Sequence, residues 1–168
     1  MSGIPQVDPT AKPTRVQAVG RAFVKTKAGT WMARTFAARV DPWLLKVSKG
    51  RVATGVGFPS INLTTIGRKS GEPRTTTLLY FTQGDDVVLI ASSFGRDKHP
   101  AWYLNLAANP EAELLCGGYS GKFTARQTEG EERDRLFALA DQLYSGYTRY
   151  AENTTRKIPV MVLSPVAK

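Results

Sequence analysis

The chain has 168 residues, 42% hydrophobic, 22% charged and 10% aromatic, which is enough for one domain with a substantial core. Its net charge is +9, and residues 1–51 carry ten Lys or Arg against Asp8 and Asp41, whereas residues 52–168 are nearly balanced. Basicity confined to one arm argues against a uniformly cationic nucleic-acid binder and favours an anionic surface. Without a spanning apolar run or a signal-peptide core, we expect a cytoplasmic protein that rests at most on the inner face of the cell membrane.

The first part of the chain differs in composition from the rest. Residues 1–14 are rich in Pro and small polar residues, and we expect them to be disordered. Residues 15–51 are expected to form a basic, amphipathic helical arm, with apolar residues at near-helical spacing over 30–48 and cations between them. Two interpretations remain open: the arm docks on its own core, or it touches membrane lipid.

From residue 52 onward the pattern changes to short strands. Turn sequences such as GRKSGEP and QGDD separate them, and Pro100 and Asn109 bound a short helix. Thr128, with Glu131 three residues later, matches a capping box that starts another helix. The strands are expected at residues 61–66, 74–82, 87–92, 113–116, 121–126 and 157–163. Because no βαβ repeat appears, the fold class is α+β: a small, mostly antiparallel barrel flanked by helices.

Several common sites are excluded. GRKSG lacks the P-loop spacing, and Gly55 and Gly57 lack the third glycine of a dinucleotide fingerprint. One histidine (His99) and one cysteine (Cys116) do not make a usual zinc site, so no metal is expected. Cys116 is predicted to be a buried structural thiol, and His99 a residue at a helix start rather than a catalytic base.

Three cations surround one glycine-flanked turn. Arg68, Lys69 and Arg74 lie with Ser70 at the turn that ends in Gly71. A guanidinium, an ammonium and exposed amides suit a phosphate or carboxylate. The alternative is an ordinary solvated hairpin tip.

The strand end Ile90, Ala91, Ser92 and Ser93 consists of small residues, which let a planar ring approach the backbone. Trp102 and Tyr103 would either line the space for this ring or pack in the hydrophobic core.

Tyr144, Tyr147 and Tyr150 recur every three residues. If Ser145 and Gly146 break the helix, the three phenols would form an aromatic lid that encloses an apolar substrate and donates a proton. The alternative is an amphipathic packing stripe.

Over residues 62–163 the chain resembles the deazaflavin-dependent nitroreductase family of actinobacteria. The resemblance rests on TTIGRKSGEPR, IASSFG, PAWYLNLAANP and LYSGYTRY. It implies a split β-barrel of the FMN-binding type and the use of reduced coenzyme F420. Departures at Thr76, Thr77, Leu79 and Ser93 put the preferred substrate in doubt.

The resemblance also implies roles for particular residues. The cationic turn would hold the phosphate and glutamyl tail, and the small residues would border the ring. Ser92, Tyr144, Tyr147 and Tyr150 would shape the substrate pocket and assist protonation. The implied cofactor-binding residues are Asn62, Thr64, Arg68, Lys69, Ser70, Gly71, Arg74, Ile90, Ala91, Ser92, Ser93, Ala101, Trp102, Tyr103 and Tyr147.

The expected function is an F420H2-dependent oxidoreductase that transfers a hydride to quinone or nitroaromatic acceptors, since the residues suit orientation and protonation more than nucleophilic chemistry. Two alternatives stay open: an FMN-dependent split-barrel reductase, and a non-catalytic carrier of the deazaflavin or of a lipid. The physiological acceptor, the proton donor and the oligomeric state are left undecided by the sequence.

Overall fold

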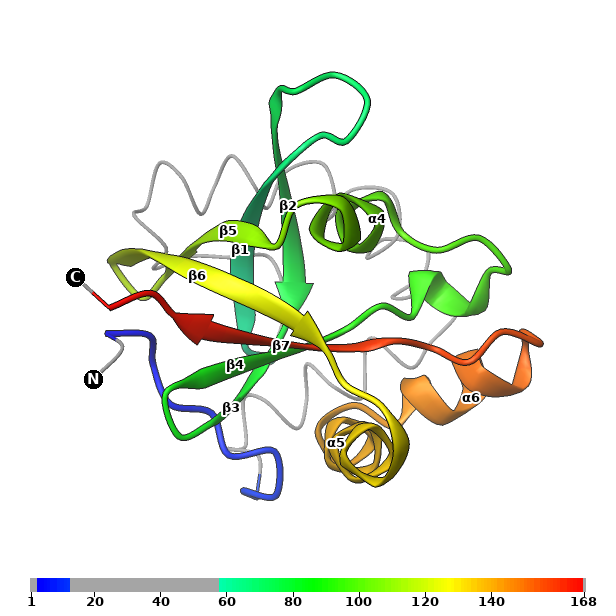
Figure 1. The fold of residues 1–168 in the computed structure, drawn as a ribbon. Helices are drawn as coiled ribbons and strands as arrows, with labels where there is room; N and C mark the ends of the chain where they lie inside the picture. Colours follow the sequence, from blue (N-terminus) through cyan, green and yellow to red (C-terminus); the bar gives the residue numbers. More distant parts are fainter. Residues whose placement is uncertain (1–2, 13–57, 168) are drawn as a thin grey trace.

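The computed structural model describes residues 3–12 and 58–167, so the expected helical arm and Gly55 and Gly57 lie outside the described residues. The described part is built on a curled, seven-stranded sheet in the order β2-β1-β5-β6-β7-β4-β3 (Figure 1). Every neighbouring pair is antiparallel, which confirms the expected architecture. The strands are β1 (Ser60–Ile66), β2 (Pro73–Leu79), β3 (Phe81–Gln83), β4 (Asp86–Ile90), β5 (Glu111–Cys116), β6 (Tyr119–Gln127) and β7 (Val160–Pro165).

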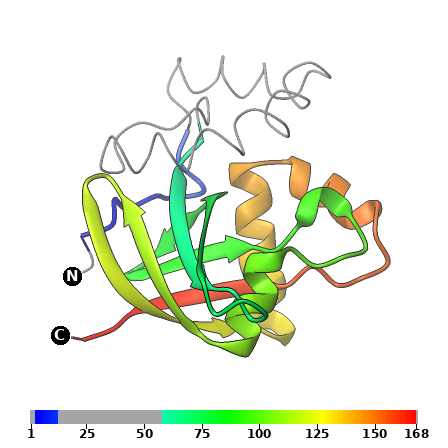
Figure 2. The same cartoon turned by 90° about the horizontal axis from the view of Figure 1, so that it is seen from above.

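A single residue joins the two end strands of the curled sheet. The strand expected over 74–82 is divided at Tyr80, because β2 pairs with β1 whereas β3 pairs with β4. β2 and β3 therefore occupy opposite ends of the strand order although one residue joins them, and the sheet has to curl for both to pair (Figure 2). The sequence over 74–82 reads as one strand, since nothing local marks the change of partner.

Two apolar cores lie on the two faces of β4 and β7. Val87 and Leu89 of β4 point into the barrel, and Val88 and Ile90 point to the outer layer. Strand side chains alternate between faces, so a strand covered on both sides reads as a continuous apolar run, as DVVLI does. β4 is thus held between the barrel and the helices.

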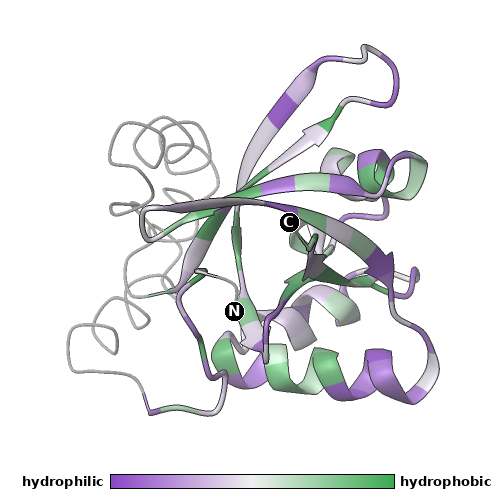
Figure 3. Ribbon diagram, turned by 60° about the vertical axis from the view of Figure 1, so that its left-hand side comes forward, coloured by the Kyte–Doolittle hydropathy of each residue, from purple (hydrophilic) through white to green (hydrophobic). Residues whose placement is uncertain are grey.

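Helix α5 (Gly130–Leu143) covers the outer face of β4 and β7. Leu136, Ala140 and Leu143 recur at helical spacing and are buried, while polar residues lie between them (Figure 3). The other helices are α4 (Ala101–Ala108), α6 (Gly146–Glu152) and the short 3-10 turn η2 (Ser93–Gly95). Helix α4 matches the expectation for 100–109, with Pro100 and Asn109 as its caps.

The expected capping box at Thr128 is wrong. Helix α5 begins at Gly130 with Glu129 as its cap residue, and no side chain caps it. The Thr128 hydroxyl instead donates to the carbonyl of Val160 at 3.0 Å, inside the protein. A tertiary contact with β7 thus replaces the local one that the sequence suggested.

Residues 3–12 have a defined place against the barrel, which differs from the disorder expected for 1–14. Ile4 is 2% exposed and lies in the barrel core. The hydroxyl of Tyr80 donates to the carbonyl of Pro5 at 3.0 Å, and the amide of Thr82 donates to that of Val7 at 3.0 Å. The segment therefore covers the corner at which the sheet closes.

Cys116 is buried, as expected, and its Sγ lies 3.4 Å from the Tyr80 hydroxyl. Burial raises the pKa of the thiol, so it stays protonated and unreactive. Within residues 3–12 and 58–167, none of the helices combines the length and apolarity that crossing a bilayer requires.

Replacing Ile4 by Ala tests the contact of the N-terminal segment with the core. The substitution should lower the free energy of unfolding by about 2 kcal/mol, because it removes buried apolar atoms. The control is Lys12→Ala, at an exposed position of the same segment. Equal denaturant midpoints for the two variants would show that the segment does not contribute to stability.

Candidate functional site

The cationic turn joins β1 to β2. The Gly67 amide donates to the Glu72 carbonyl and the Gly71 amide to the Gly67 carbonyl, both at 2.8 Å, and Gly71 has φ +70°, a backbone conformation that favours glycine. The side chains of Arg68, Lys69 and Arg74 are exposed, and none forms an ion pair with another described residue. Three positive charges with no ion-pair partner among the described residues therefore lie around one compact loop, which also contains Glu72.

A buried asparagine fastens this turn to α4. Asn105 is 5% exposed; its Oδ1 accepts from the Arg68 amide and its Nδ2 donates to the Thr65 hydroxyl, both at 3.1 Å. Sequence reasoning missed Asn105. The available signal was a lone amide within the apolar run AWYLNLAA, since a buried polar group requires partners.

The end of β4 runs into a strained turn. Ile90 and Ala91 are buried, while Ser93 and Phe94 in η2 have φ of 49° and 57°. Left-handed conformations at residues other than glycine cost roughly 1–3 kcal/mol each and persist only where surrounding contacts enforce them. Ser93, one of the predicted ring-binding residues, thus lies in a turn that the fold holds in an unfavourable conformation.

Arg156, from the loop between α6 and β7, provides such contacts. Its guanidinium donates to the carbonyls of Ala91 (3.1 Å), Ser92 (2.8 Å) and Arg96 (2.8 Å). Sequence reasoning missed this residue, because about sixty residues separate it from the carbonyls that it binds. Burial is the main cause that lowers the pKa of the guanidinium.

His99 lies just before α4, as expected, and contacts Arg156. The distance from His99 Nδ1 to an Arg156 Nη is 3.3 Å, and the imidazole packs on the ring of Tyr103 at 4.8 Å between centroids. Because a guanidinium only donates, Nδ1 accepts and the proton of the imidazole lies on Nε2. Desolvation, and then the charge of Arg156, lower the pKa of His99, which favours the neutral ring.

The three tyrosines form a cluster, and the helix breaks before α6 as expected. Helix α5 ends at Leu143, and α6 starts at Gly146. The hydroxyls of Tyr144 and Tyr150 are 3.0 Å apart, and both rings contact Tyr147, with centroids 5.3 Å and 6.4 Å away.

Tyr147 is the buried member of this phenol cluster. It is 6% exposed, and its hydroxyl forms no hydrogen bond with any described residue. Desolvation, then the neighbouring Tyr144 and Tyr150, raise the pKa of Tyr147 well above its usual value. It therefore keeps its proton at neutral pH and can act only as a proton donor, not as a base; the raised pKa makes it a weaker acid than an exposed tyrosine.

The remaining predicted residues take different positions. Trp102 is 7% exposed and belongs to the barrel core, in line with the core-anchor alternative, while Ala101 is exposed. The Tyr103 hydroxyl donates to Gln127 Oε1 at 2.7 Å. On β1, Asn62 accepts from the Thr77 hydroxyl at 2.7 Å, and Thr64 shares a hydrogen bond with Thr75. These contacts hold β1 and α4 in place beside the turn.

A series of contacts, each joining one element to the next, connects the cationic turn to the phenol cluster. Asn105 joins the turn to α4, and His99 joins the start of α4 to Arg156. Arg156 holds η2, and Gly95 of η2 packs so closely on α6 that a Cβ there would lie 2.9 Å from the Tyr150 carbonyl oxygen. Figure 1 shows α4, the η2 loop and α6 following one another along one side of the barrel.

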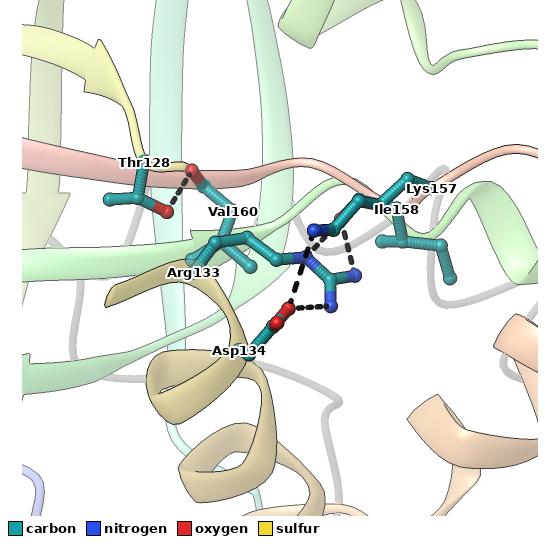
Figure 4. Close-up of polar contacts among 6 residues, drawn as sticks. All are labelled: Thr128, Arg133, Asp134, Lys157, Ile158 and Val160. Atoms are coloured by element: carbon teal, nitrogen blue, oxygen red, sulfur yellow. Dashed lines mark hydrogen bonds and ion pairs between the residues drawn. The ribbon is translucent and has the colours of Figure 1, made fainter. Parts of the chain in front are cut away.

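A separate cavity of about 270 Å³ lies at the start of α5 and contains none of the predicted site residues. Arg133 is among its lining residues, and its Nε and Nη2 donate to the Ile158 carbonyl at 3.1 and 2.7 Å (Figure 4). Asp134 contacts both Arg133 and Lys157, at 3.0 and 3.5 Å. The cations of this cavity are thus engaged in holding the chain that leads into β7.

Comparison with known proteins places this arrangement in a family. A family model described as F420H(2)-dependent quinone reductase matches residues 37–165. An F420H(2)-dependent quinone reductase of Mycobacterium tuberculosis is 38% identical over 109 residues, which cover 63% of this chain and 73% of the relative.

Two solved structures are also similar to this chain. An F420-H2 dependent reductase (FDR-A) is 37% identical with a TM-score of 0.59, over 63% of this chain and 94% of that one. A chain described as a domain-swapped dimer is 30% identical with a TM-score of 0.61, over 82% of this chain and 100% of that one. Because the family model spans the cationic turn, the β4 end and the phenol cluster together, the chain belongs to the family of F420H(2)-dependent quinone reductases.

Proposed function

We propose that this protein uses F420H2 to reduce quinones and, with them, nitroaromatic compounds. The observation that carries the proposal is the linked set of contacts that joins a cationic turn to a phenol cluster around the buried Tyr147, in a chain of this family. The first feature suits an anionic tail, and the second suits protonation of a reduced acceptor.

The residues present fit coenzyme F420. Its phosphate and glutamyl groups are anionic, and Arg68, Lys69 and Arg74 offer donors that form no ion pair with a described acid. Ser70 adds a hydroxyl, whose Oγ lies 3.5 Å from Arg74 Nη2. We assign the tail to this turn, and the ring to the small residues Ile90–Ser93 at the end of β4.

The bound coenzyme would supply the hydride. Reduction of a quinone to a hydroquinone also requires a proton at the quinone oxygen. Tyr147 holds a proton in a desolvated position, and Tyr144 and Tyr150 share one hydrogen bond through which a proton can be passed. Two phenyl rings flank the cluster, with Phe58 edge-on to Tyr144 and the exposed Phe94 edge-on to Tyr150.

Charge reversal of the turn tests the cofactor assignment. Arg68→Glu and Lys69→Glu should each weaken F420 binding by about tenfold or more, because each removes a charge-assisted contact worth about 1.5–3 kcal/mol and adds repulsion. Isothermal titration calorimetry at two salt concentrations measures the effect, with Lys122→Glu on the exposed face of β6 as the charge-matched control. Unchanged affinity in both turn variants would place the tail elsewhere.

Purification of the protein with bound FMN would favour the alternative of an FMN-dependent reductase.

Removal of the buried hydroxyl tests the proton donor. Tyr147→Phe should leave the free energy of unfolding unchanged or higher, since that hydroxyl has no hydrogen-bond partner among the described residues. The same change should lower kcat about 10²-fold with menadione or a nitroimidazole, within the range of general acid catalysis.

Tyr119→Phe, at the β5–β6 turn, is the matched control for this variant. A Tyr147→Phe enzyme with wild-type kcat would exclude Tyr147 as the donor. Tight F420 binding without turnover in any form would indicate a carrier.

We also propose peripheral contact with anionic membranes through residues 15–51, on the basis of the charge of residues 1–51. The full-length protein should sediment with phosphatidylglycerol vesicles at low salt and be released as salt rises. Replacing Arg34, Arg39 and Lys46 by Gln should weaken this binding. Equal sedimentation of the wild type and this triple variant would show that these cations are not responsible.

A further inference from the structure

Both ends of the η2 turn are held by one side chain. Arg156 binds the carbonyls of Ala91 and Ser92 before the turn and that of Arg96 after it, at 2.8 to 3.1 Å. The two left-handed residues, Ser93 and Phe94, lie between these carbonyls. The contacts therefore bracket the strained part of the backbone.

Arginine suits this task better than lysine does. A planar guanidinium presents several N–H donors in a fixed fork, whereas an ammonium is a compact charge on a flexible stem. Here Nε binds one carbonyl and Nη2 binds two, while Nη1 lies 3.3 Å from His99 Nδ1. All three nitrogens have partners, so the orientation of the side chain is set by geometry as well as by charge.

The turn that Arg156 holds also contacts the phenol cluster. Gly95 packs on the backbone of Tyr150, and the ring of Phe94 lies edge-on to that of Tyr150, 5.9 Å between centroids. The conformation of η2 therefore sets how the end of β4 and α6 face each other. By contrast, the cationic turn is fastened through Asn105, without Arg156.

We infer that Arg156 is a positioning residue for the reaction: it holds the η2 turn so that the small residues at the end of β4 face the phenol cluster. It acts through the backbone and touches neither the hydride donor nor the acceptor. The inference rests on the proposed function, since it assigns the ring to this strand end. It separates two tasks, with the cationic turn determining affinity and the Arg156 contacts determining the alignment of the reacting groups.

The test uses three variants of the full-length protein: Arg156→Gln, Arg156→Lys and the control Lys157→Gln. Lys157 is the next residue in the same loop, and its exposed side chain pairs with Asp134. The first readout, in the protein without cofactor, is hydrogen exchange at the amides of Gly95 and Arg96, which donate to Ser92 and Ser93 inside η2. Both amides should exchange faster in the two Arg156 variants and at the wild-type rate in Lys157→Gln.

The second readout is steady-state kinetics with F420H2 and menadione. In the Arg156 variants kcat should fall about 10²-fold, the size expected when reacting groups are misaligned by about 1 Å. KM for F420H2 should change by less than about threefold, since the cationic turn is intact. Full activity of Arg156→Lys, or faster exchange with unchanged kcat, would overturn the positioning role. If the wild type oxidised no F420H2, the proposed function would fail, whereas unchanged exchange in Arg156→Gln would separately refute the contacts with η2.

Discussion

The connection of β2 to β3 through Tyr80 alone is the constraint from which the rest of the fold follows. Two strands at opposite ends of a seven-stranded order are joined by one residue, so the sheet curls and brings its two ends together without pairing them. This curl gives the sheet an inner face with its own core and leaves the outer face of β4 and β7 to α5. The end of β4 then emerges where the barrel and the helices meet. This is where the strained turn, Arg156 and the phenol cluster come together.

The candidate site divides its chemistry between two kinds of groups. Positive charge is concentrated on the exposed β1–β2 turn, where solvent screens it and an anionic ligand can reach it. The phenols lie together with Tyr147 buried between two half-buried neighbours, and burial raises the pKa of Tyr147. A charged group in the cluster would have required a counterion, and a neutral donor there requires none. The separation lets the protein bind an anionic tail at one place and supply a proton at another.

Most of the fold was predictable from the sequence, because local patterns determine it. Turn sequences located the β1–β2 and β3–β4 connections, and Pro100 and Asn109 bounded α4. The features that were missed are contacts between distant residues. The division of the strand at Tyr80 depends on pairing partners, and Thr128 binds Val160 instead of capping α5. Likewise, the roles of Asn105 and Arg156 depend on carbonyls and amides about forty and sixty residues away. Composition indicates polar residues at such positions but not what they bind.

The position of residues 3–12 has one more consequence, which concerns the edge strand of the sheet. β3 is the last strand in the order, and the amide of Thr82 on it is occupied by the carbonyl of Val7. Unoccupied backbone groups on a terminal strand are templates for pairing with other chains. By satisfying that amide, the segment leaves one backbone donor fewer on this edge for pairing with another chain. If a protease cut after residue 12 and the segment dissociated, the seven strands would remain covalently intact. The Thr82 amide on the edge strand β3 would then be free to pair with another chain.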